Sequence, residues 1–281
     1  MTIAIVAEHT SEEGGNRRFV ARLADGAEVE AVLYRGDTLC ISSQVGCAVR
    51  CPFCASGANG LSRGLSFEEL VAQVELVAAL GAPIARLTVS GVGEPLHNHA
   101  PVLRLVRWAH ARGTPASLTT SGGPLPRLDE WLVEPTHNGL TLSVHAGTEP
   151  VRARLVPHAP ALEPLFALLA ERVPRLPRKR RKKLALAYLA LDGDNDDDAE
   201  LDAFAARVRA IDPALTVHLY AHNPVPTSAR RGVTRARYEA MYERLVRAGL
   251  ERVRMSSKAR LEPNGGCGTL VALRRSALSI A

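Results

Sequence analysis

The sequence predicts an α/β fold: an open, partial β/α barrel of about six parallel strands, with a short N-terminal β hairpin. Strand-like apolar segments alternate with amphipathic helical segments, which is typical of a parallel sheet with right-handed crossovers. Several strands end in polar or glycine-rich turns, such as "SGVGEP", "TTSGG" and "SVHAG". In a β/α barrel, these carboxyl ends of the strands form the active-site face. No internal repeat or long linker divides the 281 residues.

The first 35 residues predict a small β extension. "RRFVARLADGAEVEAVLY" alternates apolar and polar residues around Asp25-Gly26, a pair typical of hairpin turns. We therefore expect an N-terminal β extension over residues 1–35 and the barrel over residues 36–281.

The barrel strands are expected in "TLCISS", "RLTVSG", "ASLTTSG", "GLTLSVHA", "LALAYLAL" and "TVHLYAHN". Ser66 and Glu69 form a capping box that begins a helix through residue 80, and Gly81 ends it. Further helices are expected over residues 100–113, 125–133, 160–173, 198–211 and 235–248. "DGDNDDDAE" predicts an aspartate-rich helix start rather than a calcium loop, because Asp197 stands where an EF-hand needs glycine.

Composition indicates an ordinary globular chain. Hydrophobic residues make up 46%, and no run of 18 uncharged apolar residues predicts a membrane span. The N-terminus lacks the features of a secretory signal, so we expect a cytoplasmic protein with reduced cysteines. The net charge of +6 fits a polyanionic partner. The basic run over residues 178–183 is usually a solvated face, and phosphate contact is favoured here if the partner is RNA.

Three cysteines are crowded into "GCAVRCPFCASG": Cys47, Cys51 and Cys54, in a loop after the first barrel strand. Structural zinc usually takes four ligands in two separated pairs, and the chain has no second pair with that spacing. An odd number of cysteines in a leaderless chain does not suit a disulfide framework. Three thiolates suit an iron–sulfur cluster and leave one iron of a [4Fe–4S] cube open.

The spacing C-x3-C-x2-C, with Phe53 before the last cysteine, resembles the cluster motif of the radical S-adenosylmethionine (SAM) superfamily. The resemblance implies a [4Fe–4S] cluster on Cys47, Cys51 and Cys54, whose open iron chelates the amino and carboxylate groups of SAM. One electron then cleaves SAM to an adenosyl radical. The family also implies an external one-electron donor such as flavodoxin.

Seven ordered blocks between about Glu30 and Leu270 narrow the resemblance: "TLCISSQVGCAVRCPFCASG", "SGVGEPLHN", "TTSGG", "LSVHAGTEPVRARLVP", "LDGDND", "HNPVP" and "GGCGTL". Together they resemble the adenine C2 methyltransferases of 23S rRNA and tRNA, and their C8-methylating relatives. The resemblance implies methylation of an adenine ring carbon in RNA, at C2 or alternatively at C8, with two SAM molecules consumed per methyl group. It requires neither a membrane nor more than a monomer. Family members carry a helical accessory domain ahead of the hairpin, and we expect this chain to lack it.

The two remaining cysteines differ in their surroundings. Cys40 lies in an apolar strand pattern and on its own would be a buried core cysteine. Cys267 lies in the glycine-rich "EPNGGCGTL", which favours a reactive thiol. The resemblance implies that Cys267 carries a methyl group that is transferred as a carbon radical to adenine. It implies that Cys40 then releases the protein–RNA crosslink by forming a disulfide with Cys267, and that Glu30 removes the ring proton. Glu30 fits a solvent-facing strand glutamate equally well.

The resemblance also assigns contacts with SAM at the strand ends. Gly93 and Glu94 match the motif that receives the SAM amino group, and a carboxylate suits an ammonium-like donor. The remaining matches are Thr119, Ser143, Val144, His145 and Asn223. Considered without the resemblance, His145 would more often be a structural histidine with satisfied hydrogen bonds near a strand end than a ligand.

Two alternatives belong to other classes. One is a radical SAM enzyme that acts on a protein, peptide or small molecule, and the other is a non-catalytic iron–sulfur protein that binds RNA. The presence of both Cys40 and Cys267 favours the methyl-cysteine route over the first. The presence of the SAM motifs favours an enzyme over the second.

Overall fold

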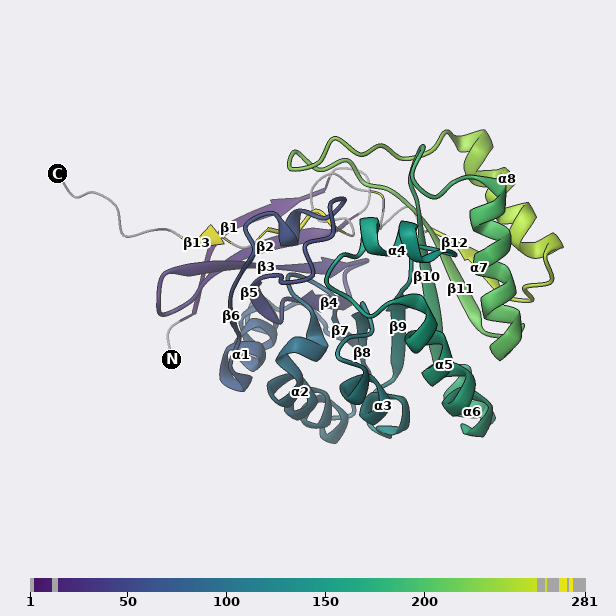
Figure 1. Cartoon of the computed structure of the whole chain (residues 1–281). Coiled ribbons are helices and arrows are strands. Elements are labelled where there is room, and N and C mark those ends of the chain that lie inside the picture. The colour runs from purple at the N-terminus through teal and green to yellow at the C-terminus, as the bar shows by residue number, and fades with distance from the viewer. Residues whose placement is uncertain (1–2, 12–14, 257–260, 262–267, 272, 275–281) are drawn as a thin grey trace.

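One continuous sheet forms the body of the protein in the computed structural model, which describes residues 3–11, 15–256, 261, 268–271 and 273–274 (Figure 1). Its strand order is β1-β2-β3-β4-β7-β8-β9-β10-β11-β12. The first three strands form an antiparallel meander: β1 (Ala4–Thr10), β2 (Arg17–Arg22) and β3 (Ala27–Tyr34). Because β3 pairs with β4 (Thr38–Ile41), the N-terminal extension and the barrel share one sheet.

From β4 onward the strands are parallel, which confirms the predicted partial barrel. They are β7 (Arg86–Val89), β8 (Ala116–Thr120), β9 (Gly139–Ser143), β10 (Leu184–Ala190), β11 (Thr216–Ala221) and β12 (Val253–Met255). All six predicted strands are present. On the main path of this sheet, two further strands, β1 and β12, were not predicted. A further short strand, β13 (Leu273–Arg274), pairs with the start of β3.

Helices connect the parallel strands and cover the outer side of the sheet (Figure 1). Those at the expected positions are α1 (Phe67–Ala78), α2 (His99–Ala111), α3 (Leu125–Val133), α5 (Leu162–Arg172), α7 (Asp198–Ile211) and α8 (Arg235–Arg247). Ser66 and Glu69 form the predicted capping box of α1, and Asp197 caps α7 as expected of a helix start. The short helices α4 (Glu149–Leu155) and α6 (Arg178–Arg181) were not predicted. No described helix is long and apolar enough to cross a membrane.

The barrel strands are two-faced, and this positions the site. In β7, β8 and β9, fully buried apolar residues alternate with half-buried small polar ones. Leu87, Leu118 and Leu140 belong to the core, while Thr88, Thr119 and Thr141 are only partly covered. Since successive side chains of a strand point to opposite faces, the apolar set packs under the helices and the polar set lines the barrel interior.

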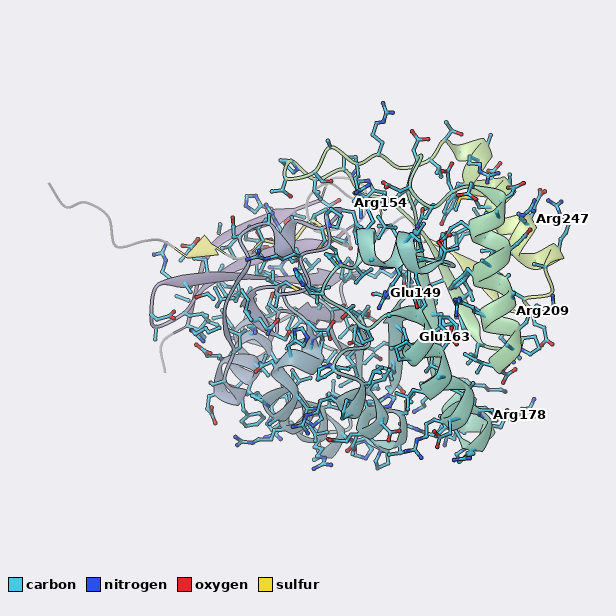
Figure 2. All side chains as sticks on the ribbon, in the orientation of Figure 1. Glu149, Arg154, Glu163, Arg178, Arg209 and Arg247 are labelled. Atoms are coloured by element: carbon cyan, nitrogen blue, oxygen red, sulfur yellow. The ribbon has the colours of Figure 1, made fainter. Side chains whose placement is uncertain are left out.

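The basic run lies at the amino end of β10, whereas the polar turns after β7, β8 and β9 lie at the carboxyl ends. In a parallel sheet these are opposite edges, and Figure 2 shows Arg178 far from Arg154 on α4, which follows β9. Arg180 also turns inward, donating to the carbonyl of His137 at 3.1 Å and to that of Glu134. Phosphate contact by the rest of the run stays a prediction.

The buried His137 makes stability depend on pH. Burial, with the nearby Arg180 charge, lowers the pKa of His137 from 6.5 to about 4. Below pH 6.5 the unfolded chain therefore binds a proton that the folded chain excludes. We expect the free energy of unfolding to fall as the pH drops from 6.5 toward 4, by up to about 1.4 kcal/mol per pH unit from this group.

Replacing His137 by asparagine removes that proton uptake, so urea unfolding between pH 7 and pH 4.5 should show a shallower pH slope for His137→Asn. The exposed His110 on α2 provides the matched control, and His110→Gln should keep the wild-type slope. An unchanged slope in His137→Asn would contradict the assignment.

Candidate active site

The cysteine loop is held at its base by a two-stranded clamp of β5 (Gln44–Gly46) and β6 (Leu61–Gly64). The amide of Cys47 donates to the carbonyl of Gly60 at 3.0 Å, which closes the loop. Gly46 has a φ of +83°, and a Cβ there would lie 1.8 Å from the Gly60 carbonyl oxygen. Only glycine fits this crossing, which fixes where the loop leaves the sheet.

The loop is also docked onto a segment near the C-terminus. The amide of Ala55 donates to the carbonyl of Gly268 at 2.9 Å, and the Ser56 hydroxyl donates to the carbonyl of Leu270 at 2.8 Å. On the other side of this segment, the amide of Val271 donates to Glu30 at 2.7 Å. Residues 268–271 therefore bridge the cysteine loop and β3.

A cavity opens at the carboxyl ends of the parallel strands, and Cys47, Cys51 and Cys54 line one wall of it. The lining also includes most of the other predicted residues, namely Gly93, Glu94, Thr119, Ser143, His145 and Asn223. Five segments far apart in the sequence thus converge on one space. Val144 is fully buried in the core and does not line the cavity.

Two of the three thiols, those of Cys47 and Cys51, are poor acids in this setting. Burial raises the pKa of Cys47 to about 12, and the pKa of Cys51 is raised well above its usual range. Burial is the main cause, and the neighbouring thiols and Glu94 add to it. Thiolates this close therefore require a bound cationic group.

The donor set fits an iron–sulfur cluster. Among the described residues, no three His, Cys, Asp or Glu side chains converge on a point that a single metal ion could occupy. A cuboidal cluster binds each cysteine at a separate iron, so its ligands are spread more widely. The backbone at Val49 and Arg50 opposes the rise in the pKa of Cys47 by hydrogen bonding to its sulfur, as at cluster cysteines.

Glu94 is the buried acidic residue of the cavity, only 3% exposed. Its carboxylate accepts hydrogen bonds from the Thr120 hydroxyl at 2.5 Å and from the Ser121 amide at 2.7 Å. The amide of Glu94 donates to the Gln44 side chain at 2.7 Å, which ties the turn after β7 to the base of the cysteine loop. A carboxylate held rigidly beside three cysteines fits the amino group of SAM.

His145 is held neutral at the end of β9. Burial, with the charge of Arg152, lowers the pKa of His145 to about 3. Its Nδ1 accepts the Leu189 amide at 3.0 Å, and its ring meets the Phe53 ring edge-on at 5.3 Å. His145 is therefore hydrogen-bonded as a structural histidine would be, and it also lines the cavity, as the resemblance implies.

Cys40 lies just behind the cavity wall, 2% exposed, with its sulfur 3.3 Å from the Ser90 hydroxyl. Ser90 lines the cavity, so one hydroxyl separates Cys40 from it. The described cysteines, Cys40, Cys47, Cys51 and Cys54, form no disulfide with one another. Cys267 lies outside the described residues, but the next residue, Gly268, lines the cavity.

Glu30 does not line the cavity. Its carboxylate is 3.1 Å from the Arg18 guanidinium and accepts the Val271 amide at 2.7 Å. Burial raises the pKa of Glu30, and the Val271 amide and the Arg18 charge oppose the rise. Glu30 is therefore neither solvent-facing nor part of the cavity, and its role as a base stays a prediction.

Sequence reasoning missed several cavity residues. Ser121, Tyr220 and His222 line the cavity, and Arg152 lies behind it. The alternation in "TVHLYAHN" places His218, Tyr220 and His222 on one face of a strand and could have indicated the ring residues. No local pattern marks Arg152, because its partners are backbone carbonyls in other turns, 8 to 31 residues away.

Comparisons with known proteins agree with this geometry. The family model described as "Radical SAM superfamily" matches residues 41–205. A probable RNA methyltransferase of Rhodopseudomonas palustris (strain BisB5) is 40% identical over 224 residues, which cover 76% of this chain and 60% of the relative. The dual-specificity RNA methyltransferase RlmN of Halorhodospira halophila is 35% identical over 283 residues, covering 97% of this chain and 77% of the relative.

A crystal structure of a radical SAM methyltransferase from Sphaerobacter thermophilus superposes with a TM-score of 0.83 at 30% identity, covering 95% of this chain and 81% of that one. Streptococcus suis SuiB bound to S-adenosylmethionine shares the fold alone, with a TM-score of 0.59 at 13% identity, over 80% of this chain and 51% of that one. The chain therefore belongs to the radical SAM superfamily, and within it to the group whose members are named RNA methyltransferases. Membership implies a [4Fe–4S] cluster and SAM.

The clamp at Gly46 predicts a sharp contrast between two glycines. Gly46→Ala combines a positive φ with a backbone clash, and we expect a loss of roughly 3 kcal/mol or more in unfolding free energy, with little iron bound after reconstitution. Gly36 has a φ of +77°, and a Cβ there would meet nothing within 4 Å, so Gly36→Ala should cost about 1–2 kcal/mol and keep its iron. Urea unfolding and iron analysis measure both. Equal behaviour of the two variants would show that the clamp does not fix the loop.

Proposed function

We propose that the protein methylates a ring carbon of an adenine in RNA, at C2, with 23S rRNA or tRNA as the substrate. The observation that supports this best is the cavity itself, where three cysteines, a buried carboxylate and the residue after Cys267 face one space. Relatives named as RNA methyltransferases supply the substrate class. Because the aligned region spans 60% of one relative and 77% of another, the substrate is inferred for this chain.

The cofactors would be held by opposite walls of the cavity. Cys47, Cys51 and Cys54 would ligate the [4Fe–4S] cluster, and Glu94 would receive the amino group of SAM. Together the two groups supply a one-electron cleavage of SAM that removes a hydrogen atom from an otherwise unreactive carbon. Thr119, Ser143 and Asn223 offer hydrogen-bonding groups along the rest of the bound SAM.

Cys267 would be the methyl carrier. The docked segment 268–271 brings the chain next to Cys267 into the cavity, because Gly268 is bonded to the cysteine loop. An aromatic ring carbon is a weak nucleophile, so a carrier thiol that presents the methyl group for hydrogen removal suits this chemistry. Two SAM molecules would then be consumed per methyl group.

Cys40 would release the product. Once adenine is joined to the carrier, the Cys40 thiolate would attack the Cys267 sulfur and form the S–S bond. The electron pair of the broken S–C bond passes to the methylene carbon on the base, which takes up a proton to complete the methyl group. Ser90, 3.3 Å from the Cys40 sulfur and open to the cavity, would relay the thiol proton, taking it up as its own hydroxyl proton passes to the cavity. A donor such as flavodoxin would supply single electrons, and a monomer suffices for every step.

The direct test is methylation of 23S rRNA and tRNA transcripts by the reconstituted enzyme, followed by mass spectrometry of the nucleosides. We expect 2-methyladenosine. 8-Methyladenosine would move the target to C8, and methylation of neither RNA, by enzyme that cleaves SAM, would favour a protein, peptide or small-molecule substrate.

The carrier role predicts that Cys267→Ala abolishes methylation while cluster content and reductive SAM cleavage remain. Peptide mass spectrometry of the wild-type protein should show one added methyl group on Cys267. Cys47→Ala is the matched control, because it should lose the cluster and SAM cleavage together. Normal methylation by Cys267→Ala would exclude the carrier mechanism.

The release role predicts that Cys40→Ala accumulates a covalent enzyme–RNA adduct, visible as a shifted band under denaturing conditions. Ser90→Ala should slow release and show the adduct only transiently, since it keeps the Cys40 thiol. If Cys40→Ala turned over without any adduct, another group would have to resolve the crosslink.

A further inference from the structure

Three rings lie in a row along β11 and the residue that follows it. His218, Tyr220 and His222 are two residues apart, so they share the face of the strand that looks into the barrel. The rings of His218 and Tyr220 are stacked, with planes 5° apart and centroids at 5.6 Å. Tyr220 and His222 line the cavity, so the row leads from the barrel interior to the cysteine wall.

His222 is an unsatisfied group facing the cavity. Both of its ring nitrogens are buried, and neither makes a hydrogen bond of normal geometry within the described part of the chain. Burial lowers the pKa of His222, opposed by the nearby Phe53 backbone, so the ring is neutral and offers one donor and one acceptor. A buried imidazole left in this state is costly unless a ligand completes its hydrogen bonds.

A positive charge stands beside the row. Arg254 of β12 is the register partner of His218, so the two side chains share the same face, and Arg254 is exposed. The row thus combines a flat aromatic surface, a neutral hydrogen-bonding ring and a cation, which are the groups that bind the base, the base edge and the phosphate of a nucleotide.

We propose that Tyr220, His222 and Arg254 form the subsite for the target nucleotide of RNA: the base stacks on Tyr220, its edge bonds to His222, and its phosphate pairs with Arg254. This rests on the proposed function. SAM and the target nucleotide both carry an adenine ring, so stacking on Tyr220 alone does not distinguish them. Arg254 favours the RNA nucleotide, because SAM has no phosphate and carries a sulfonium cation.

The test uses fluorescent adenine analogues on the reconstituted enzyme with saturating SAM. 2-Aminopurine riboside 5′-monophosphate should be quenched on binding, and Tyr220→Leu should weaken binding roughly five- to thirty-fold, as expected for lost stacking. Tyr220→Phe should bind normally, and His222→Leu should weaken binding. Arg254→Gln should weaken binding of the monophosphate and leave binding of the riboside unchanged. Tyr242→Leu on α8, a half-buried tyrosine outside the cavity, is the control and should behave as wild type.

Equilibrium dialysis of SAM separates the two sources of adenine. Unchanged SAM affinity in Tyr220→Leu, with loss of the analogue, supports the proposal and shows that the variant is folded. Loss of SAM affinity would assign the ring row to the cofactor and overturn it. Normal analogue binding by Tyr220→Leu would also overturn it, while RNA methylation by the wild-type enzyme would leave the proposed function standing.

Discussion

One buried guanidinium fastens the floor of the cavity. Arg152 is 1% exposed and donates to the carbonyls of Ser121, Ser143, Val144 and Pro160, at 2.7, 2.6, 2.9 and 3.1 Å. The first three of these carbonyls belong to the ends of β8 and β9 and the turns after them, where the backbone leaves the sheet and loses its strand partners. Leaving several buried carbonyls unsatisfied would be costly, so the strand ends depend on this one side chain.

The same side chain links the fold to the chemistry of the site. Ser121 and Ser143 line the cavity, and Ser121 also donates its amide to Glu94. Burial lowers the pKa of Arg152 to about 10, with Cys51, Glu149 and Glu94 opposing the shift, so the group remains a cation. A fixed positive charge therefore stands near Cys51 and Glu94, which the proposed reaction would use. Lysine could not replace it, because a single ammonium cannot span four carbonyls.

The fold could be predicted where its cause is local. The Ser66–Glu69 capping box, the Asp25-Gly26 turn and the alternation in β7 to β9 depend on neighbours in sequence, and all three are present. The short strands could not be predicted, because the three residues of β12 and of β5 carry no periodic pattern and form only by pairing with distant partners.

The residues of the candidate site likewise fall into two groups: those that the sequence identifies and those that are positioned by distant partners. Cysteine spacing identified Cys47, Cys51 and Cys54. The resemblance assigned Glu94 and Ser143, which lie at polar strand ends that meet at one edge of the sheet. The place of Glu30 could not be foreseen, since it depends on Arg18 and on the Val271 amide. Arg180 shows the converse: it belongs to a charged run in the sequence, but its guanidinium bonds to the carbonyl of His137.

The bridge made by residues 268–271 has a consequence for the order of events. Gly268 and Leu270 accept hydrogen bonds from Ala55 and Ser56. Ordering of the segment 268–271 and ordering of the cysteine loop are therefore energetically coupled. Whatever orders the loop must strengthen docking of the segment, and docking must strengthen the loop by the same factor. The segment that follows Cys267, the proposed carrier, is therefore docked best when the loop beside it is already assembled. Such reciprocity favours a definite order: an enzyme whose loop is not yet assembled docks the segment 268–271 less firmly.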